Sequence, residues 1–218
     1  MTSGTGPHAD THLPLRERKK RRTRRALADT ALRLFRDRGY EETTLEELVT
    51  EVEVSMRTFF RYFSSKEDVA LAAETELWNA WVEEFVRREI RGTALEGLRD
   101  AVLSALRGMD EEWFDRLLRT RLLAARTPAL RERHASASHD AETRLLRELE
   151  NRFGTDSSAD VRLPLLAEMS LSAFRCGGKN WLADKPGGAP DNGRAALLNR
   201  VAEAFDALPG SMSLSPGS

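Results

Sequence analysis

Apolar residues recur along this chain mainly at helical spacing, three or four positions apart, and no stretch alternates as a strand does. The clearest stripe near the N-terminus predicts a helix over about 23–38, with Gly39 in the position of a C-cap. Its apolar members are Leu27, Ala31, Leu34 and Phe35. The pattern therefore indicates an all-α protein.

Two short helices joined by a corner are expected next, over about 45–52 and 56–63. Thr44 precedes the first of them, and Glu47 three residues later completes a capping-box pattern. Ser55 precedes the second and is expected to cap it.

The second short helix has one apolar and one polar face. Phe59 and Phe63 lie four residues apart and are expected to be buried together. The other face offers guanidinium groups, which bind guanine edges, and apolar atoms, which contact thymine methyl groups. These features predict the recognition helix of a helix-turn-helix. The outward residues are Met56, Arg57, Thr58, Arg61 and Tyr62.

The segment resembles the DNA-binding head of the tetracycline-repressor (TetR) family. The matching residues are Leu34-Phe35, Gly39-Tyr40, Thr43-Thr44, Leu48, Val54-Ser55, Thr58-Phe59-Phe60, Tyr62-Phe63 and Ser65-Lys66-Glu67. The chain departs from the family pattern at Val49, where alanine is usual, and at Glu53, where glycine is usual. A non-glycine residue in a left-handed corner costs about 1 kcal/mol.

The resemblance implies a repressor that binds a palindromic DNA operator as a homodimer and is released by a small hydrophobic effector. Arg57 and Arg61 are expected to contact bases, with Met56 and Thr58 as secondary contacts. The residues expected to hold the DNA backbone are Arg21, Arg22, Thr43, Thr44, Ser55, Phe60, Tyr62 and Lys66.

Charge is unevenly distributed along the chain. Residues 1–66 carry a net charge of +4 and residues 67–218 a net charge of −5. This division fits a DNA-contacting head on a body that makes no DNA contact. Eight of the ten residues 16–25 are basic, which indicates either a solvated charge run or an arm that binds phosphates or the minor groove.

We expect a disordered tail over 1–15, a DNA-binding domain with its basic arm over 16–65, a helical ligand-binding and dimerisation domain over 66–208, and a mobile tail over 209–218. A long helix over about 66–90 would link the two domains as a lever. The remaining helices are expected near 94–106, 110–125, 128–153, 159–182 and 192–208, with a Pro/Gly-rich linker over 184–193.

The last two helices carry more apolar surface than one small bundle needs. That surface forms either internal core or a two-fold four-helix interface, which the resemblance favours. The interface residues would be Leu165, Met169, Leu198, Val201 and Phe205.

Aromatic residues gather in the body, either as plain core or as the wall of an apolar effector cavity, which the resemblance implies. The cavity residues would be Trp78, Trp81, Phe85, Trp113, Phe114 and Phe174. Three arginines, Arg119, Arg121 and Arg126, are expected beside them, and they favour an anionic or acyl-thioester effector.

Other chemistry finds little support in the sequence. Nucleotide-binding, hydrolase and metalloprotease motifs are missing, so neither an enzyme nor a cofactor is expected. His8 and His12 fall in the tail, while His134 and His139 are expected at the surface. The single cysteine, Cys176, is expected to be buried and fits a reducing cytoplasm.

No stretch is apolar enough to cross a membrane. Two other function classes stay open at this point. One is a sequence-nonspecific nucleoid binder, and the other is a ligand-binding or catalytic helical protein with no role on DNA.

Overall fold

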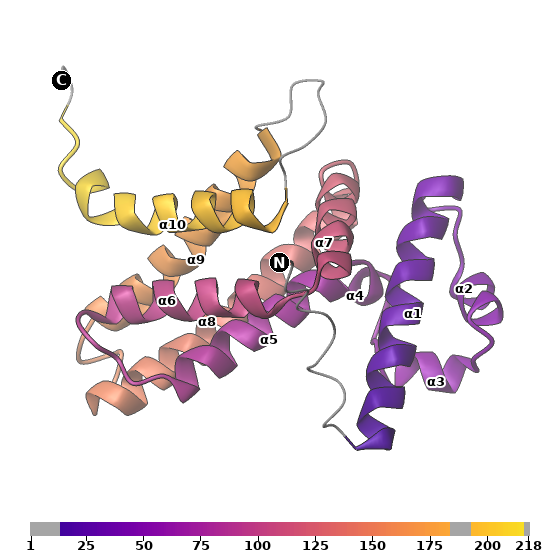
Figure 1. Cartoon of the computed structure of the whole chain (residues 1–218), viewed down its shortest axis with the longest axis horizontal. Helices are drawn as coiled ribbons and strands as arrows, with labels where there is room; N and C mark the ends of the chain where they lie inside the picture. Colours follow the sequence, from indigo (N-terminus) through magenta and orange to yellow (C-terminus); the bar gives the residue numbers. More distant parts are fainter. Residues whose placement is uncertain (1–13, 184–192, 216–218) are drawn as a thin grey trace, which may run out of the picture. The chain divides into compact units, whose positions relative to one another are not determined.

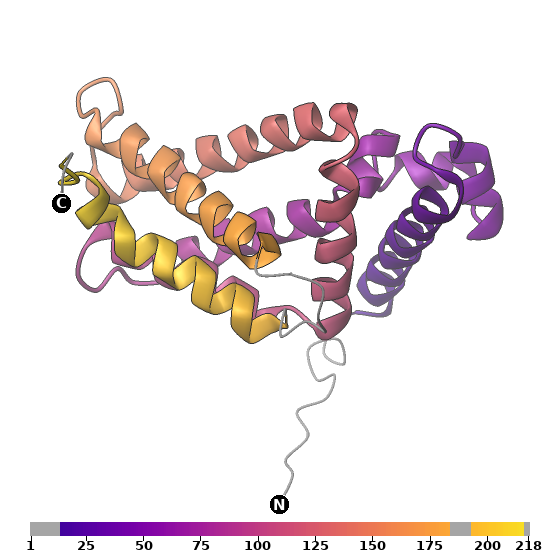
Figure 2. The ribbon, with the colours of Figure 1, turned by 90° about the horizontal axis from the view of Figure 1, so that it is seen from above.

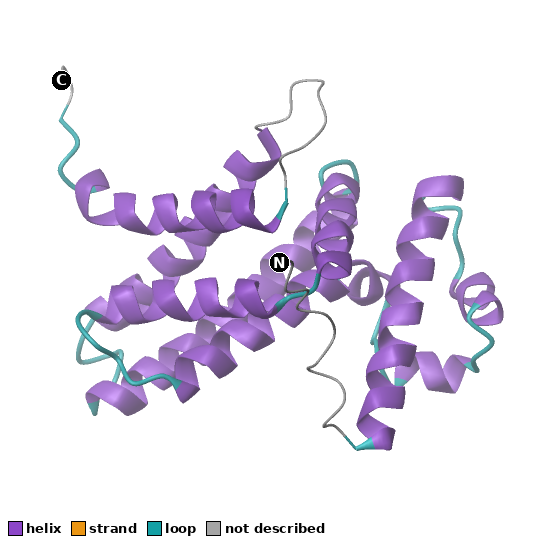
Figure 3. Ribbon diagram, in the orientation of Figure 1, coloured by secondary structure: helices purple, strands orange, loops and turns teal. Residues whose placement is uncertain are grey.

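The computed structural model describes residues 14–183 and 193–215. Over these residues the chain forms ten α-helices and no strand, which confirms the all-α class (Figures 1 and 3). None of these helices is long and apolar enough to span a bilayer. Residues 1–13 of the expected tail, including His8 and His12, residues 184–192 of the expected linker, and residues 216–218 lie outside the described part.

The chain folds into two compact units. The head unit takes in the chain up to Ala72 together with Arg119–Leu130, and the body unit takes in Ala73–Leu118 and the chain from Arg131 onward. The first five helices are α1 (Leu15–Arg38), α2 (Leu45–Glu51), α3 (Met56–Phe60), α4 (Lys66–Ala70) and α5 (Ala72–Arg87). The others are α6 (Ala94–Gly108), α7 (Glu111–Ala124), α8 (Pro128–Phe153), α9 (Arg162–Ala183) and α10 (Arg194–Ser211).

The head unit is built around a small apolar core. Phe35, Leu48, Phe59 and Phe63 are all buried in it, as their spacing predicts. Leu130, in the first turn of α8, joins the same core and is fully buried. The α7–α8 turn therefore belongs to the head, although the sequence assigned it to the body.

Helix α1 begins at Leu15, eight residues before the predicted start at position 23. The basic run that was expected to be an arm is therefore helical. Arginine and lysine have good helix propensity, and Glu17 lies in the first turn, where the helix end is positive.

The predicted lever helix is interrupted at Leu71, so α4 and α5 are separate helices. Residues 70–72 are alanine and leucine, so helix propensity does not explain the break. The carbonyl oxygen of Ala70 accepts a buried hydrogen bond from the Thr120 hydroxyl at 2.9 Å. This tertiary bond and the buried side chain of Leu71 both lie at the point of interruption.

Helix α5 ends at Arg87 instead of the predicted residue 90. Arg152 of α8 donates to the carbonyl oxygens of Val86 at 2.8 Å and Arg88 at 2.7 Å. Its guanidinium also lies 4.8 Å from the centroid of the Phe85 ring. A side chain from another helix thus satisfies the free carbonyls that end α5.

Helices α9 and α10 lie side by side in the body (Figure 2). A Cβ atom at Gly177 would lie 2.7 Å from the carbonyl oxygen of Arg200 and 2.8 Å from the Cα of Val201. Only glycine permits this close approach of the two backbones.

The ends of these two helices differ from those expected. Helix α9 begins at Arg162 instead of residue 159, so Pro164 falls in the first turn, where its missing N–H is tolerated. Helix α10 continues through Pro209 to Ser211, whose hydroxyl donates to the Leu208 carbonyl at 2.7 Å. The first residues of the expected mobile tail are therefore helical.

Candidate functional site

The recognition helix α3 follows the corner between α2 and α3. Ser55 is its N-cap, because its hydroxyl accepts from the backbone N–H of Thr58 at 3.1 Å. The Thr58 hydroxyl lies 3.0 Å from the Ser55 hydroxyl. Both hydroxyls are thus fixed at the start of α3, as the cap pattern predicts for Ser55.

Helix α3 is amphipathic in the expected sense. Phe59 is fully buried, whereas Arg57 and Arg61 are exposed and Phe60 is 54 % exposed. Met56, Thr58 and Tyr62 are half-buried. The Arg61 guanidinium lies 5.1 Å from the centroid of the Tyr62 ring. Helix α3 ends at Phe60, earlier than the predicted residue 63, and Arg61 is its C-cap. Arg57 on the helix and Arg61 directly after it present two guanidinium groups to solvent, next to a core that contains Phe59.

The corner before α3 contains a residue in the left-handed region. Glu53 has φ 55°, and it is the non-glycine residue with positive φ among those described. Its side chain is exposed, so no burial offsets the strain of the Cβ atom.

Glu53→Gly is expected to raise the free energy of unfolding of the head by roughly 0.5–1 kcal/mol, because glycine adopts positive φ without a Cβ clash. Glu53→Ala is the matched control, since it removes the charge and keeps the Cβ atom. Urea denaturation followed by circular dichroism measures both. Equal stabilisation by alanine would show that charge, and not backbone strain, is the cause.

The start of α2 carries the predicted capping box. The Thr44 hydroxyl accepts from the N–H of Glu47 at 3.2 Å, and the Glu47 carboxylate accepts from the N–H of Thr44 at 3.0 Å. That backbone hydrogen bond lowers the pKa of Glu47. Thr43, by contrast, is buried, and its hydroxyl donates to the Gly39 carbonyl at 2.8 Å. Its hydroxyl serves the local structure, so we remove Thr43 from the expected DNA surface.

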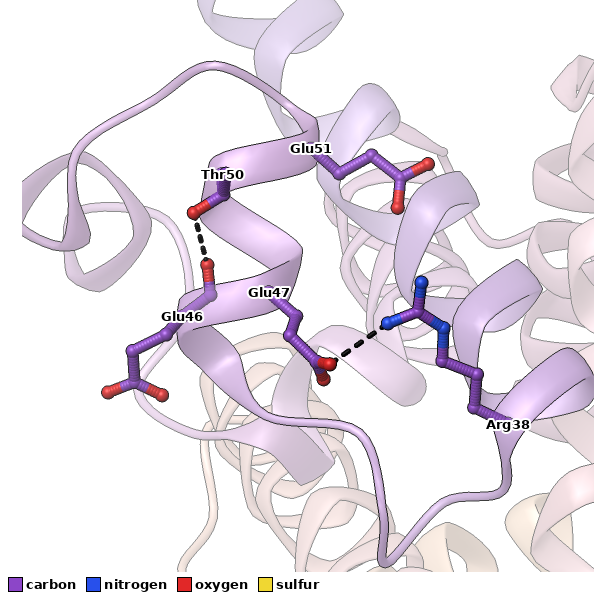
Figure 4. Close-up of a pocket in the computed structure, with 5 residues that line it drawn as sticks. All are labelled: Arg38, Glu46, Glu47, Thr50 and Glu51. Atoms are coloured by element: carbon purple, nitrogen blue, oxygen red, sulfur yellow. Dashed lines mark hydrogen bonds and ion pairs between the residues drawn. The ribbon is translucent and has the colours of Figure 1, made fainter.

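A shallow surface pocket lies between α1 and α2 (Figure 4). It is lined by Arg38, Glu46, Glu47, Thr50 and Glu51. Arg38 donates to the Glu47 carboxylate at 2.9 Å. Glu51 likewise pairs with Arg33, so two of the three carboxylates that line the pocket are engaged by arginines of α1.

Lys66 lies at the first turn of α4, after its N-cap Ser65. Its ammonium group is 4.4 Å from the centroid of the Tyr40 ring. The Tyr40 hydroxyl donates to Glu67 at 2.6 Å, and burial together with this bond raises the pKa of Tyr40. Burial also acts to raise the pKa of Glu67, but the hydrogen bonds from Tyr40 and Ser65 outweigh it, so that pKa is lowered. Lys66 is thus held beside a fixed aromatic ring.

The first half of α1 is a basic ridge, by which we mean its exposed residues Arg16, Arg18, Lys19, Lys20, Arg21 and Arg22. The ridge is fastened to the segment after α3 by the next basic residue. Arg24 donates to the Tyr62 carbonyl at 2.8 Å and lies 4.4 Å from the centroid of the Phe63 ring. Helical basic residues and the recognition helix are therefore parts of one packed unit.

The six predicted cavity residues are all buried in the core of the body, with side chains at most 4 % exposed. Five of them are in direct ring contact with another of the six. Trp78 packs edge-on against Phe174 at 4.9 Å and lies 5.9 Å from Trp81, and Trp113 packs against Phe114 at 5.0 Å.

The three arginines that were expected beside these aromatic residues belong to the head unit, because that unit includes Arg119–Leu130. Arg119 lies 3.8 Å from the Asp29 carboxylate of α1. The end of α7 therefore belongs to a different unit from the aromatic residues of the body core.

Two of the predicted dimer residues face inward. Val201 and Phe205 are at most 1 % exposed and fill the body core, because α10 turns this face toward α6 and α9. Leu198 and Met169 are half-buried, and Leu165 is 48 % exposed. The outward apolar surface is therefore mainly that of α9.

Two further expectations are wrong. Cys176 is exposed on α9, because the buried side of that turn is taken by Gly177 and Gly178. His134 is not a free surface residue, because its Nδ1 contacts the buried carboxylate of Glu74. His139 is exposed, as expected.

Sequence reasoning missed the Glu74–His134 pair. The sequence feature that could have revealed the pair is the position of Glu74, a carboxylate at helical spacing from Trp78 and Trp81 on the apolar face of α5. In the part of the chain that the structure describes, no group of acidic, histidine or cysteine side chains could hold a metal ion.

Comparison with known proteins supports this geometry. Residues 27–73 match the family model described as bacterial regulatory proteins, tetR family. The chain is 38 % identical over 172 residues to the HTH-type transcriptional regulator TcmR of Streptomyces glaucescens, and the match covers 77 % of this chain and 76 % of TcmR.

Solved structures show the same fold at lower identity. A TetR-family regulator from Syntrophomonas wolfei aligns with a TM-score of 0.53 at 17 % identity, covering 91 % of this chain and all of that one. SmeT, in a structure titled as its triclosan complex, aligns with a TM-score of 0.53 at 19 % identity, covering 90 % of this chain and 96 % of SmeT. The capped helix-turn-helix, the all-helical body and the similarity to TcmR together show that the chain belongs to the TetR family of bacterial transcriptional regulators.

Proposed function

We propose that this TetR-family regulator is a repressor that works in the cytoplasm as a homodimer and leaves a palindromic operator when a small effector binds its body unit. The observation that carries the proposal is the pair of exposed guanidinium groups of Arg57, on α3, and Arg61, at its C-cap, while Phe59 on the other face of α3 is buried in the core. Arginine binds guanine O6 and N7 in the major groove.

The backbone contacts in this proposal come from two places. The basic ridge would supply positive charge for phosphates, and Arg24 links α1 to the segment directly after α3. Thr44, Ser55, Phe60, Tyr62 and Lys66 would supply further contacts around the recognition helix. Thr44 and Ser55 already serve as caps, so their hydroxyls would bind phosphate only as a second role.

Two heads would bind two half-sites about 34 Å apart, one helical turn of DNA, or at a multiple of that spacing. An effector that favours a mismatched head separation by a few kcal/mol is enough to release the operator. SmeT, which shares the fold, is titled as a complex with triclosan, and this supports a small-molecule site in a body of this kind.

Selection of bound fragments from genomic DNA, followed by footprinting, tests the proposal. We expect a few fragments that share a palindrome, with protection at both half-sites. Recovery of fragments without a common sequence would contradict sequence-specific binding and would instead indicate a nucleoid-type binder.

The dimer prediction uses the outward residues of α9. Leu165→Asp with Met169→Asp is expected to convert the dimer to monomers, because two carboxylates would be buried without a partner in an apolar interface. Leu122→Asp, at an exposed leucine of the head unit, is the matched control. Sedimentation velocity measures the mass of each variant, and an undisturbed dimer in the double variant would place the interface elsewhere.

A further inference from the structure

The facing surfaces of α5 and α8 in the body unit each begin with polar residues and end with apolar ones. On α5 the buried face is Glu74, Trp78, Trp81 and Phe85. On α8 the corresponding face is His134, Ser138, Ala141, Leu145 and Leu149. Both series have the spacing of one helix face.

Contacts between the two helices fix their register. His134 Nδ1 contacts the Glu74 carboxylate at the start of both faces. Farther along, Arg144 donates to the Asn79 side chain at 2.6 Å, and Arg152 bonds the carbonyls at the end of α5. The order of contacts is the same in both helices, so they run in parallel. Trp78 and Ser138, each one turn after the Glu74–His134 pair, therefore lie at the same level.

Trp78 and Ser138 are buried polar groups with unmet hydrogen-bonding capacity. Trp78 is 3 % exposed and Ser138 is 2 % exposed, and neither the indole N–H nor the hydroxyl has a hydrogen-bond partner among the described residues. Other tryptophans of the same core are satisfied. Trp81 donates to the Leu98 carbonyl and Trp113 to the Ala73 carbonyl, both at 3.0 Å. Unmet buried donors are rare in folded proteins, because they are costly unless something binds them.

The surroundings of this pair define the chemistry of a ligand. Phe174 and Trp81 supply aromatic walls next to Trp78. Buried charge in this interior lies beside groups of opposite sign or hydrogen-bonding groups. The buried carboxylate of Glu74 contacts His134, and the buried guanidinium of Arg116 lies 3.7 Å from Asp110 and 4.0 Å from Glu112. Positive charge is therefore already balanced here, which disfavours the anionic effector expected from the sequence.

We propose that Trp78 and Ser138 form the hydrogen-bonding end of the effector site and select an uncharged aromatic compound with a carbonyl oxygen. The indole N–H donates to one lone pair of that oxygen and the Ser138 hydroxyl to the other. The aromatic rings of the ligand pack against Trp81 and Phe174. The role of this compound as effector rests on the proposed function, whereas its binding does not.

Equilibrium dialysis of the full chain against 9-fluorenone and fluorene tests the proposal. The two probes share a planar ring system and differ by the carbonyl oxygen. We expect the chain to bind fluorenone about tenfold more tightly than fluorene, the size of effect that one hydrogen bond to a buried donor gives. Trp78→Phe, which keeps an aromatic ring and removes the N–H, is expected to lower the ratio, and the preference that remains would come from the Ser138 hydroxyl.

Ser138→Ala is expected to lower the same ratio, and Ser136→Ala, at an exposed serine of α8, is the control that leaves it unchanged. Thermal unfolding checks that each variant is folded. The proposal is overturned if fluorenone does not bind, if both probes bind equally, or if Trp78→Phe keeps the wild-type ratio.

Dialysis contains no DNA, so its outcome is independent of the proposed function. If the chain binds fluorenone through Trp78 but selects no DNA fragment, the proposed ligand site is supported and the proposed repressor function is contradicted. If the chain selects a palindrome but shows no preference for the carbonyl probe, the repressor function is supported and the ligand site is contradicted.

Discussion

Phe59→Ala is expected to unfold the head unit and abolish operator binding while the body unit keeps its structure. Phe59 is fully buried, and its ring lies 5.8 Å from that of Phe63 and 5.4 Å from that of Phe60. Truncating a buried phenylalanine costs about 3–5 kcal/mol. A unit of this size has a total stability of only about 4–10 kcal/mol, at roughly 0.05–0.15 kcal/mol per residue.

Hydrogen exchange followed by mass spectrometry measures this effect peptide by peptide. Peptides of α1–α3 are expected to lose protection, and peptides of α9 and α10 are expected to keep it. The control is Phe60→Ala, the same substitution at the adjacent but exposed ring, which is expected to change stability by less than about 0.5 kcal/mol. Equal protection of the head in both variants would show that Phe59 is not central to its core.

Neutralising the basic ridge is expected to weaken DNA binding on the order of 100-fold at physiological salt. The variant replaces four exposed residues by glutamine, which keeps helix propensity and removes charge. The four are Arg18, Lys19, Arg21 and Arg22. Each lost phosphate contact is expected to lower the slope of log affinity against log salt by about 0.9, because fewer counterions are released.

A matched variant carries four glutamines on the body unit and is expected to keep the wild-type slope. Its positions are the exposed residues Arg87, Arg91, Arg107 and Arg147. Binding titrations at several salt concentrations measure both variants. If the ridge variant keeps the wild-type slope, the first half of α1 makes no phosphate contacts and its charge run is only a solvated surface.

Local sequence signals predict the caps and the buried face of the helix-turn-helix in the head. The Thr44–Glu47 capping box, the Ser55 cap and the burial of Phe59 and Phe63 all follow from residues within four positions of each other. Such short-range patterns need no tertiary information.

Features set by distant residues were predicted poorly. The break at Leu71 follows Ala70, whose carbonyl accepts from Thr120, 50 positions away along the chain. Periodicity alone also cannot say which neighbour covers an apolar face, so Val201 and Phe205 looked like interface residues but are core. The same limit hid His134, whose partner Glu74 lies on another helix.

The central claim is that side chains of α3 contact DNA bases in a sequence-specific way, and the Arg57→Ala variant tests it most directly. Its affinity is measured at one salt concentration for the operator, for each single-base variant of the operator and for unrelated DNA. We predict a loss of about 1–3 kcal/mol on the operator and loss of discrimination at one base pair of each half-site, with unrelated DNA nearly unaffected. Equal weakening on all three kinds of DNA would make Arg57 a phosphate contact and would contradict the claim.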